Sequence, residues 1–525
     1  MLPVIERELR VASRKTSTYR RRVLVALFGV LLASFFLLLA AFNAAPRFSG
    51  SALFMTMGTL AFLFSLLEGM RHAADCISAE KREGTLGLMF LTDLNGFDIV
   101  LGKLSAIAVR SLHSLLSFFP VLAIALLLGG VTGGEFFRMV LVMLNALFLS
   151  LGVGIGVSAL TRRAHIAISL TFVALTSLTV VPFILRLITQ RLGQDSVSLW
   201  IGSLSPLTSM SLVDEGSYLG NVRAYWISIA AGQVFGWGMI ALAARSIRFS
   251  WQERGVQSPE QSNIFRKDHA IKRAAFRKKM LAVNPILWLS SRQPEQTRLS
   301  WSFSLLIVLI ATPLLYFESG AVGSNVLVVI TSLALKVWLV IQACTPFAQA
   351  RETGAIELWL VTPLRLNQVV NGQILALLRI FGLPVFLLCG WQLLANIFSI
   401  MADLSQGNFD SLLQLFLVGM FQIGFLVDVA SIALVGMWLG LREQTLTRAI
   451  FKTLGLTLVL PTFLQFCCIP SLVINVVLGG IAYSRIYDTL KSYAATRFGT
   501  NDARSNWWYF GGSSTPSQPP IIPRG

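Results

Sequence analysis

Four charged residues stand within or close to long apolar runs: Arg110, Lys336, Arg379 and Asp428. A charge buried in lipid is costly, and it often marks a substrate path or a structural ion pair. Arg110 and Arg379 lie near the expected cytoplasmic ends of their runs, so we expect their long side chains to reach the membrane surface. Lys336 and Asp428 lie deeper, where we favour pairing across the helix bundle and keep a substrate path as the alternative.

Residues typical of catalysis form no recognisable site. Neither the histidines nor the cysteines have metal-ligand spacing, and the cysteines form no disulfide framework. These residues are His72, His113, His165, His269, Cys76, Cys344, Cys389, Cys467 and Cys468. Glu68 and His113 stand near expected span ends, and we expect them at the membrane interface. We therefore predict that the chain is not an enzyme and holds neither metal nor cofactor.

The composition excludes an ordinary soluble enzyme. Of 525 residues, 55% are hydrophobic and only 13% are charged, whereas a soluble domain has about 25% charged residues. The formal net charge of +18 is compatible with nucleic-acid binding in principle, but this chain has little polar surface to carry the bases. The composition instead predicts a membrane protein whose positive charge gathers on one side.

Twelve apolar runs are each close to the length of about 20 residues that a spanning helix needs. They lie near Val23–Phe42, Ala52–Leu67, Leu112–Leu128, Val140–Ala159, Ile166–Leu187, Ala224–Ala244, Trp301–Phe317, Val326–Ala343, Ile374–Phe398, Leu412–Leu439, Ile450–Phe466 and Ser471–Tyr487. The predicted fold class is an all-α polytopic membrane protein with about twelve transmembrane helices.

Lysine and arginine concentrate in the N-terminal segment and in the linker between the sixth and seventh runs. Because positive residues stay in the cytoplasm, we expect both termini there, in a plasma or inner membrane. A signal peptide is the alternative for the N-terminus, but the first apolar run exceeds the usual length of about 7–15 residues.

A polar loop after the second run recurs after the eighth, 270 residues later. Residues 83–94 (EGTLGLMFLTDL) align with residues 353–364 (TGAIELWLVTPL), and Gly156–Pro182 aligns with Gly436–Pro461. The pattern predicts a parallel duplication of two six-helix units. We place the units at 1–245 and 284–504, with a basic linker at 246–283 and a disordered tail at 505–525.

Each repeated loop combines a glycine that permits a turn with apolar residues at helical spacing. We expect a short helix that lies along the cytoplasmic interface and offers a rigid protrusion to a partner; a loop without any partner is the alternative. The candidate contact residues are Glu83, Gly84, Thr85, Leu86, Met89, Leu94, Gly354, Ile356, Leu358 and Leu364.

The loop pattern, with the hydrophobic pair and Gly102-Lys103 that follow it, resembles the cytoplasmic loop of type-2 ABC transporter permeases of the export class. Residues 3–10 and, more weakly, 284–287 resemble the amphipathic segment before the first span of each permease unit. The resemblance implies a complete transmembrane domain that moves a substrate by alternating access. It also implies two copies of an ATP-binding subunit as partners, which hold the ATP and Mg. Three positions of the second copy depart from the pattern: Thr353, Gln373 and Ser290.

The sequence contains no Gly-x-x-x-x-Gly-Lys-Ser/Thr phosphate loop, so we expect ATP hydrolysis in a partner chain. A major-facilitator-type carrier also has six plus six spans. Its loop between spans two and three is short and has a Gly-x-x-x-Asp-Arg-type turn, whereas this loop runs from about Glu68 to Asp98 without one. A non-transporting membrane scaffold is a further alternative, because one fold supports several functions.

Overall fold

A computed structural model describes residues 30, 34, 50–91, 95–127, 129–193, 195–250, 277–290, 297–298, 300–302, 304–305, 321–405, 411–466 and 470–497. Within these ranges the chain is helical and has no strand. A helix satisfies its backbone hydrogen bonds internally, which a chain surrounded by lipid requires. The fold is that of an all-α polytopic membrane protein.

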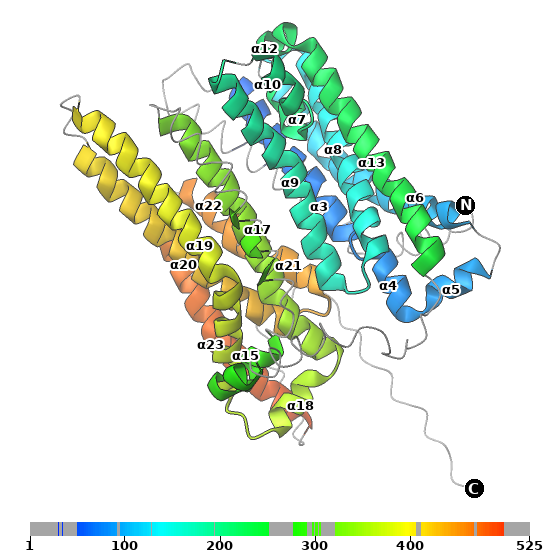
Figure 1. The fold of residues 1–525 in the computed structure, drawn as a ribbon, viewed down its shortest axis with the longest axis vertical. Coiled ribbons are helices and arrows are strands. Elements are labelled where there is room, and N and C mark those ends of the chain that lie inside the picture. The colour runs from blue at the N-terminus through cyan, green and yellow to red at the C-terminus, as the bar shows by residue number, and fades with distance from the viewer. Residues whose placement is uncertain are drawn as a thin grey trace, which may run out of the picture.

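The first half of the chain, residues 50–250, forms a bundle in which α3 and α13 pack along α8 (Figure 1). Its elements are α3 (Gly50–His72), α4 (Cys76–Glu83), α5 (Thr85–Phe90), α6 (Gly96–Leu115), η1 (Leu116–Phe118), α7 (Phe119–Leu127), α8 (Gly133–Leu160), α9 (Ala164–Arg191), α10 (Asp195–Gly202), α11 (Pro206–Ser211), α12 (Glu215–Gly220) and α13 (Val222–Ser250).

The second half, residues 277–497, packs α17 and α23 along α20. Its elements are α15 (Pro285–Ser290), α17 (Ala321–Glu352), α18 (Ala355–Val361), α19 (Leu366–Ser405), α20 (Ser411–Arg442), α21 (Leu446–Leu454), the π-helix η2 (Gly455–Val459), α22 (Leu460–Phe466) and α23 (Ser471–Arg497). Pro461 follows η2 and cannot donate a backbone hydrogen bond, which accounts for the irregular turn before it.

Eight helices in the described ranges are long and apolar enough to cross a membrane. They include the expected second to sixth and eighth to tenth spans. The expected first span and most of the seventh lie outside the described residues. The eleventh is divided among α21, η2 and α22, and the twelfth forms α23; neither is among the eight. Residues 251–276 of the basic linker and the whole of the expected tail at 505–525 also lie outside the described residues.

The two halves meet where α9 lies beside α17 (Figure 1). The amide of Gln342 donates to the Ser169 hydroxyl at 3.1 Å, and Gln349 is hydrogen-bonded to His165. Arg71 of α3 stacks on Phe451 of α21, with 5.0 Å between the guanidinium carbon and the ring centroid. Met70, Ile168 and Phe172 also join the apolar core of the second half. The halves therefore share a continuous interface that is polar at several points.

Helices α10 to α12 cover the end of the first bundle opposite α5 (Figure 1). Arg138 near the start of α8 pairs with Glu215 of α12 and donates from its Nε to the Val213 carbonyl at 2.9 Å. The hydrogen bond from Arg138 lowers the pKa of the Glu215 carboxyl. In the second half, only the four residues 467–470 separate α22 from α23. This connection is too short for a counterpart of α10 to α12.

The contact between α3 and α8 depends on Gly69. A Cβ atom at this position would come within 2.2 Å of the Ser150 backbone, whereas a Cβ on Gly238 in α13 would meet nothing within 4 Å. We expect Gly69→Ala to lower the free energy of unfolding by about 1–3 kcal/mol through overpacking. Gly238→Ala, which gains helix propensity, should leave stability equal or higher. Thermal unfolding of both variants in detergent measures the difference; equal midpoints would contradict the packing.

Candidate functional sites: paired loops and intramembrane charges

The two repeated loops adopt the same backbone turn. Gly84 and Gly354 end α4 and α17 with φ of 73° and 71°, in the left-handed region that favours glycine. A short helix follows each glycine, α5 after Gly84 and α18 after Gly354. The next long helices, α6 and α19, begin at residues 96 and 366, again 270 residues apart. The glycine turn and the short helix after it thus match in the two loops, as the sequence does.

Each short helix is anchored by one buried apolar side chain. Leu86 and Ile356 are both only 2% exposed and belong to the cores of their own halves. Met89 and Leu364 are partly buried against the same cores. We had expected Leu86 and Ile356 to contact a partner directly. Their burial instead makes them supports that hold each loop against its bundle.

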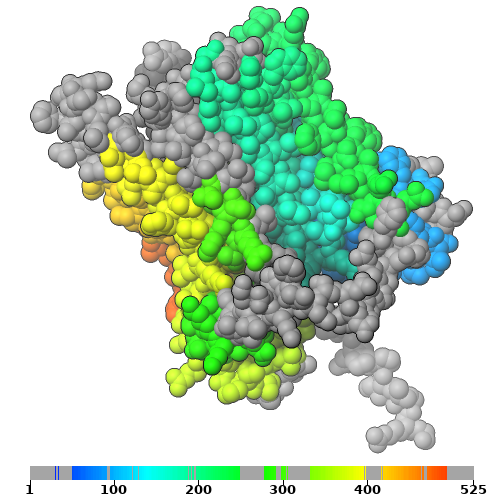
Figure 2. Space-filling model, viewed as in Figure 1, coloured from blue at the N-terminus to red at the C-terminus, as the bar shows by residue number. Residues whose placement is uncertain are grey.

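The outward faces of α5 and α18 carry apolar residues at matching positions. Leu88 is 63% and Leu91 80% exposed, and their counterparts Leu358 and Val361 are 69% and 77% exposed. Of these four, sequence analysis selected only Leu358, although the alignment already placed Leu88 opposite it. Figure 2 shows the blue surface around α5 and the yellow-green surface around α18 at separate places on the molecule.

The remaining candidate residues of the loops divide by exposure. Glu83 is exposed, and Thr85 and Gly354 are partly buried. Leu94 lies outside the described residues. Glu83 is therefore the one acidic candidate that the structure places on the loop surface.

The loops are supported by different polar contacts. In the first half, Lys103 of α6 donates from Nζ to Glu80 Oε1 at 2.6 Å, and Glu80 also accepts from the Thr85 hydroxyl. In the second half, Gln373 replaces Lys103 and accepts from the Ser290 hydroxyl of α15 at 2.7 Å. In the alignment of the two halves, Ala350 corresponds to Glu80. An ion pair therefore holds the first loop against α6.

Comparisons with known proteins identify no relative. Neither a scan against protein-family models nor a search of curated proteins finds a match.

Lys336 and Asp428 are brought together, as the sequence favoured. Lys336 Nζ donates to Asp428 Oδ2 at 2.6 Å, and Asn475 of α23 donates from Nδ2 to Asp428 Oδ1 at 2.6 Å. Both charged side chains are 16% exposed. Sequence analysis missed Asn475, because an asparagine 47 residues from its partner gives no local signal.

Glu68 is buried and Arg110 is partly buried, within one network of polar side chains. Glu68 is 1% exposed; it accepts from Ser111 Oγ at 3.1 Å and from Arg71 at 3.1 Å, and its Oε2 lies 3.2 Å from His72 Nε2. Arg110 contacts His72 Nδ1 at 3.1 Å. Helix α3 continues beyond Leu67 to His72, so Glu68 packs against α6. The i, i+3 and i, i+4 spacing of Glu68, Arg71 and His72 was the available signal.

The contacts of His72 fix its tautomer in this arrangement. Arginine can only donate, so Nδ1 accepts from Arg110, and Nε2 carries the proton that points at Glu68. His72 is thus a neutral link between a carboxylate and a guanidinium. Arg379, one register position from Arg110 in the second half, instead lies against Met280, with 3.6 Å between Nη1 and Sδ.

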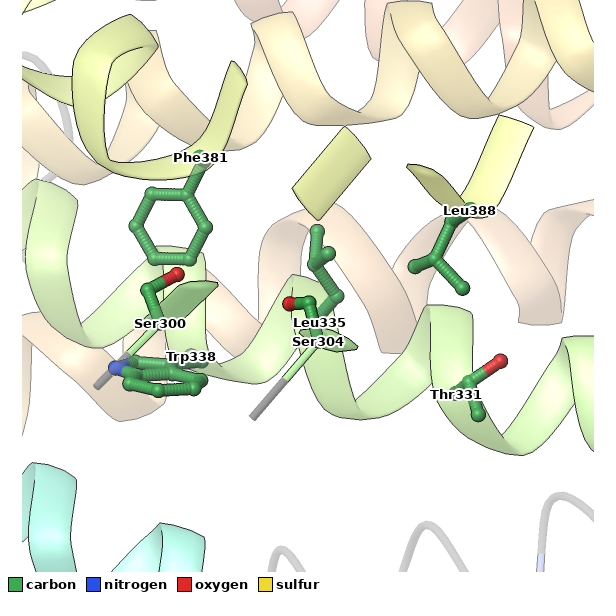
Figure 3. A pocket seen from close by; sticks show the side chains of 7 residues that line it. All are labelled: Ser300, Ser304, Thr331, Leu335, Trp338, Phe381 and Leu388. Carbon is green, nitrogen blue, oxygen red and sulfur yellow. The ribbon is translucent and has the colours of Figure 1, made fainter. Parts of the chain in front are cut away.

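The second half has aromatic rings where the first has this polar network. In the alignment of the two halves, Trp338 corresponds to Glu68 and Phe381 corresponds to Ser111. The two rings pack edge to face, with their centroids 6.2 Å apart. Beside them is a narrow cavity with room for little more than one water molecule (Figure 3). It is lined by Ser300, Ser304, Thr331, Leu335, Trp338, Phe381 and Leu388. No group of three potential metal ligands occurs among the described residues.

Exchanging the charges of Glu80 and Lys103 tests the support of the first loop. Lys103→Glu places two carboxylates together in a mostly buried position, and we expect a loss of about 3 kcal/mol in stability. The double variant Glu80→Lys with Lys103→Glu restores attraction and should recover most of it. Thermal unfolding measures both variants; no recovery in the double variant would show that the ion pair is not the stabilising contact.

Proposed function

We propose that this chain is the membrane-spanning permease of an ATP-driven transporter, most simply an exporter, built from two six-helix units in parallel duplication. The single observation that carries the proposal is the pair of loops with matched backbone, matched anchors and matched exposed apolar faces. Two equivalent docking surfaces suit two copies of one partner. Because the chain lacks a phosphate loop, ATP hydrolysis is assigned to that partner, which also holds Mg.

The exposed apolar faces support docking to protein. Leu88, Leu91, Leu358 and Val361 lie on short helices beyond the long apolar segments, where water competes for contact. Exposed apolar groups at such a place favour a protein partner or the membrane interface. Arg82, Arg351 and Arg365 stand close to them in sequence, which favours the cytoplasmic side under the positive-inside rule.

The helices behind the loops offer a route for mechanical coupling. From the second loop, α17 extends over 32 residues, with Pro346 near its loop end, and packs on α9 of the first half. A helix of this length spans about 48 Å. Movement of a docked subunit would therefore reach the interface between the halves, as alternating access requires.

Loss of the exposed faces should separate the chain from its ATPase. In the variant Leu88→Asp with Leu358→Asp, we expect copurification of a nucleotide-binding subunit from native membranes to fall at least tenfold, because two desolvated contacts are replaced by charges. Photolabelling with 8-azido-ATP detects the subunit. These positions spare Leu86 and Ile356, whose replacement would also disturb folding.

Leu219→Asp is the matched control, because Leu219 is 68% exposed on α12 at the opposite end of the first half. It should retain the subunit. Full retention in the double variant would contradict docking at the loops. Copurification without nucleotide-stimulated flux in reconstituted vesicles would assign the chain to a scaffold.

A further inference from the structure

A polar cluster lies deep within the second half. It joins α17, α20 and α23 through Lys336, Asp428 and Asn475, and Lys336 Nζ also lies 5.4 Å from the centroid of the Phe425 ring. With a rise of about 1.5 Å per residue, Asp428 is about 21 Å from the end of α20 at Arg442. Because the hydrocarbon core is about 30 Å thick, Asp428 lies at the depth of the hydrocarbon core rather than in bulk water.

The fold does not need these charges. In the sequence alignment of the halves, Leu66 corresponds to Lys336 and Phe148 to Asp428. Phe148 packs on Trp237 with ring centroids 5.4 Å apart. The first half thus has apolar side chains at both positions, and replacing a buried ion pair by apolar groups is commonly neutral or stabilising. The charges in the second half therefore have a role other than packing.

Two further oxygen atoms of the cluster lack hydrogen-bond partners among the described residues. Asn475 is 1% exposed; its Nδ2 donates to Asp428, and its Oδ1 has no hydrogen-bond partner. Ser431 is 2% exposed, with an Oγ likewise without a partner. Ser431 lies one turn after Asp428 and faces α23 beside Gly479. Buried polar atoms of this kind point to a ligand.

We propose that Asp428, Asn475 and Ser431 form an intramembrane site for one monovalent cation, and that the Lys336 ammonium, paired with Asp428, supplies the positive charge in this conformation as a tethered cation. The carboxylate supplies one negative charge, and the amide and hydroxyl supply neutral oxygens, which are ligands that hard cations prefer. When α17 moves away from α20, a free cation takes the place of the ammonium. The cation is either sodium or the ammonium group of an amine.

Removing the tethered cation exposes the site to free ligands. Thermal unfolding of the full chain with Lys336→Met is compared in sodium chloride, ethylammonium chloride and choline chloride at equal ionic strength. Because a ligand that binds only the folded state stabilises it, sodium or ethylammonium should raise the midpoint by about 2 °C over choline. The salt that acts identifies the source of the cation. The wild-type chain, whose site is filled, should show no such rise.

Two variants control for nonspecific salt effects. Lys336→Met with Asp428→Asn removes the negative charge and should lose the rise. Lys452→Met breaks the ion pair of an exposed lysine with Glu443, which lies outside the polar cluster. This variant should show no cation-specific rise. A Lys336→Met protein without a cation-specific rise, or a rise that survives Asp428→Asn, overturns the proposal.

Lys336→Gln is measured in parallel, because its amide can still donate to Asp428 and preserve the fold. If both variants unfold in every salt, a free cation does not replace the ammonium and the proposal fails. The experiment uses no ATPase, so its result is independent of the docking proposed above.

Discussion

The cost of an unsatisfied polar group in lipid governs this structure. Long helices satisfy the backbone, and the polar side chains among them are placed against one another. Glu68 touches Arg71, His72 and Ser111, while Asp428 touches Lys336 and Asn475. The contacts join helices distant in sequence. The same rule explains why the loops must end their helices cleanly: Gly84 and Gly354 reverse the chain where glycine alone turns without strain.

The two halves share the same arrangement of loop and helices but differ in their polar contacts. The shared arrangement consists of the left-handed glycine, the short helix, its buried anchor and the long helix that follows. Within it, the first half has the Glu68 network and the Lys103–Glu80 pair, whereas the second has Trp338 against Phe381 and Gln373 bonded to Ser290. Two docking surfaces can therefore be alike while the spans behind them respond differently. Such a division suits a transporter in which one partner drives two unequal halves.

Sequence periodicity predicted the long helices well, because uninterrupted apolar runs leave few other structures in lipid. Helix-helix contacts were predicted only where charge demanded them, as for Lys336 and Asp428. The contacts of Glu68 were not predicted, because the sequence did not show that α3 continues into charged residues while still packed against α6. The loop glycines were predicted from their repetition, but the exposed face was not: Leu86 and Leu88 look equivalent in sequence, and only packing distinguishes the buried anchor from the exposed residue.

The central claim is that the matched faces of α5 and α18 bind two copies of one nucleotide-binding subunit. Site-specific photocrosslinking tests it most directly, with a photoreactive amino acid at Leu88 in one variant and at Leu358 in another, both in native membranes. The account predicts that both positions crosslink to the same ATP-binding polypeptide. Crosslinks to lipid alone, or to different proteins at the two positions, would contradict it.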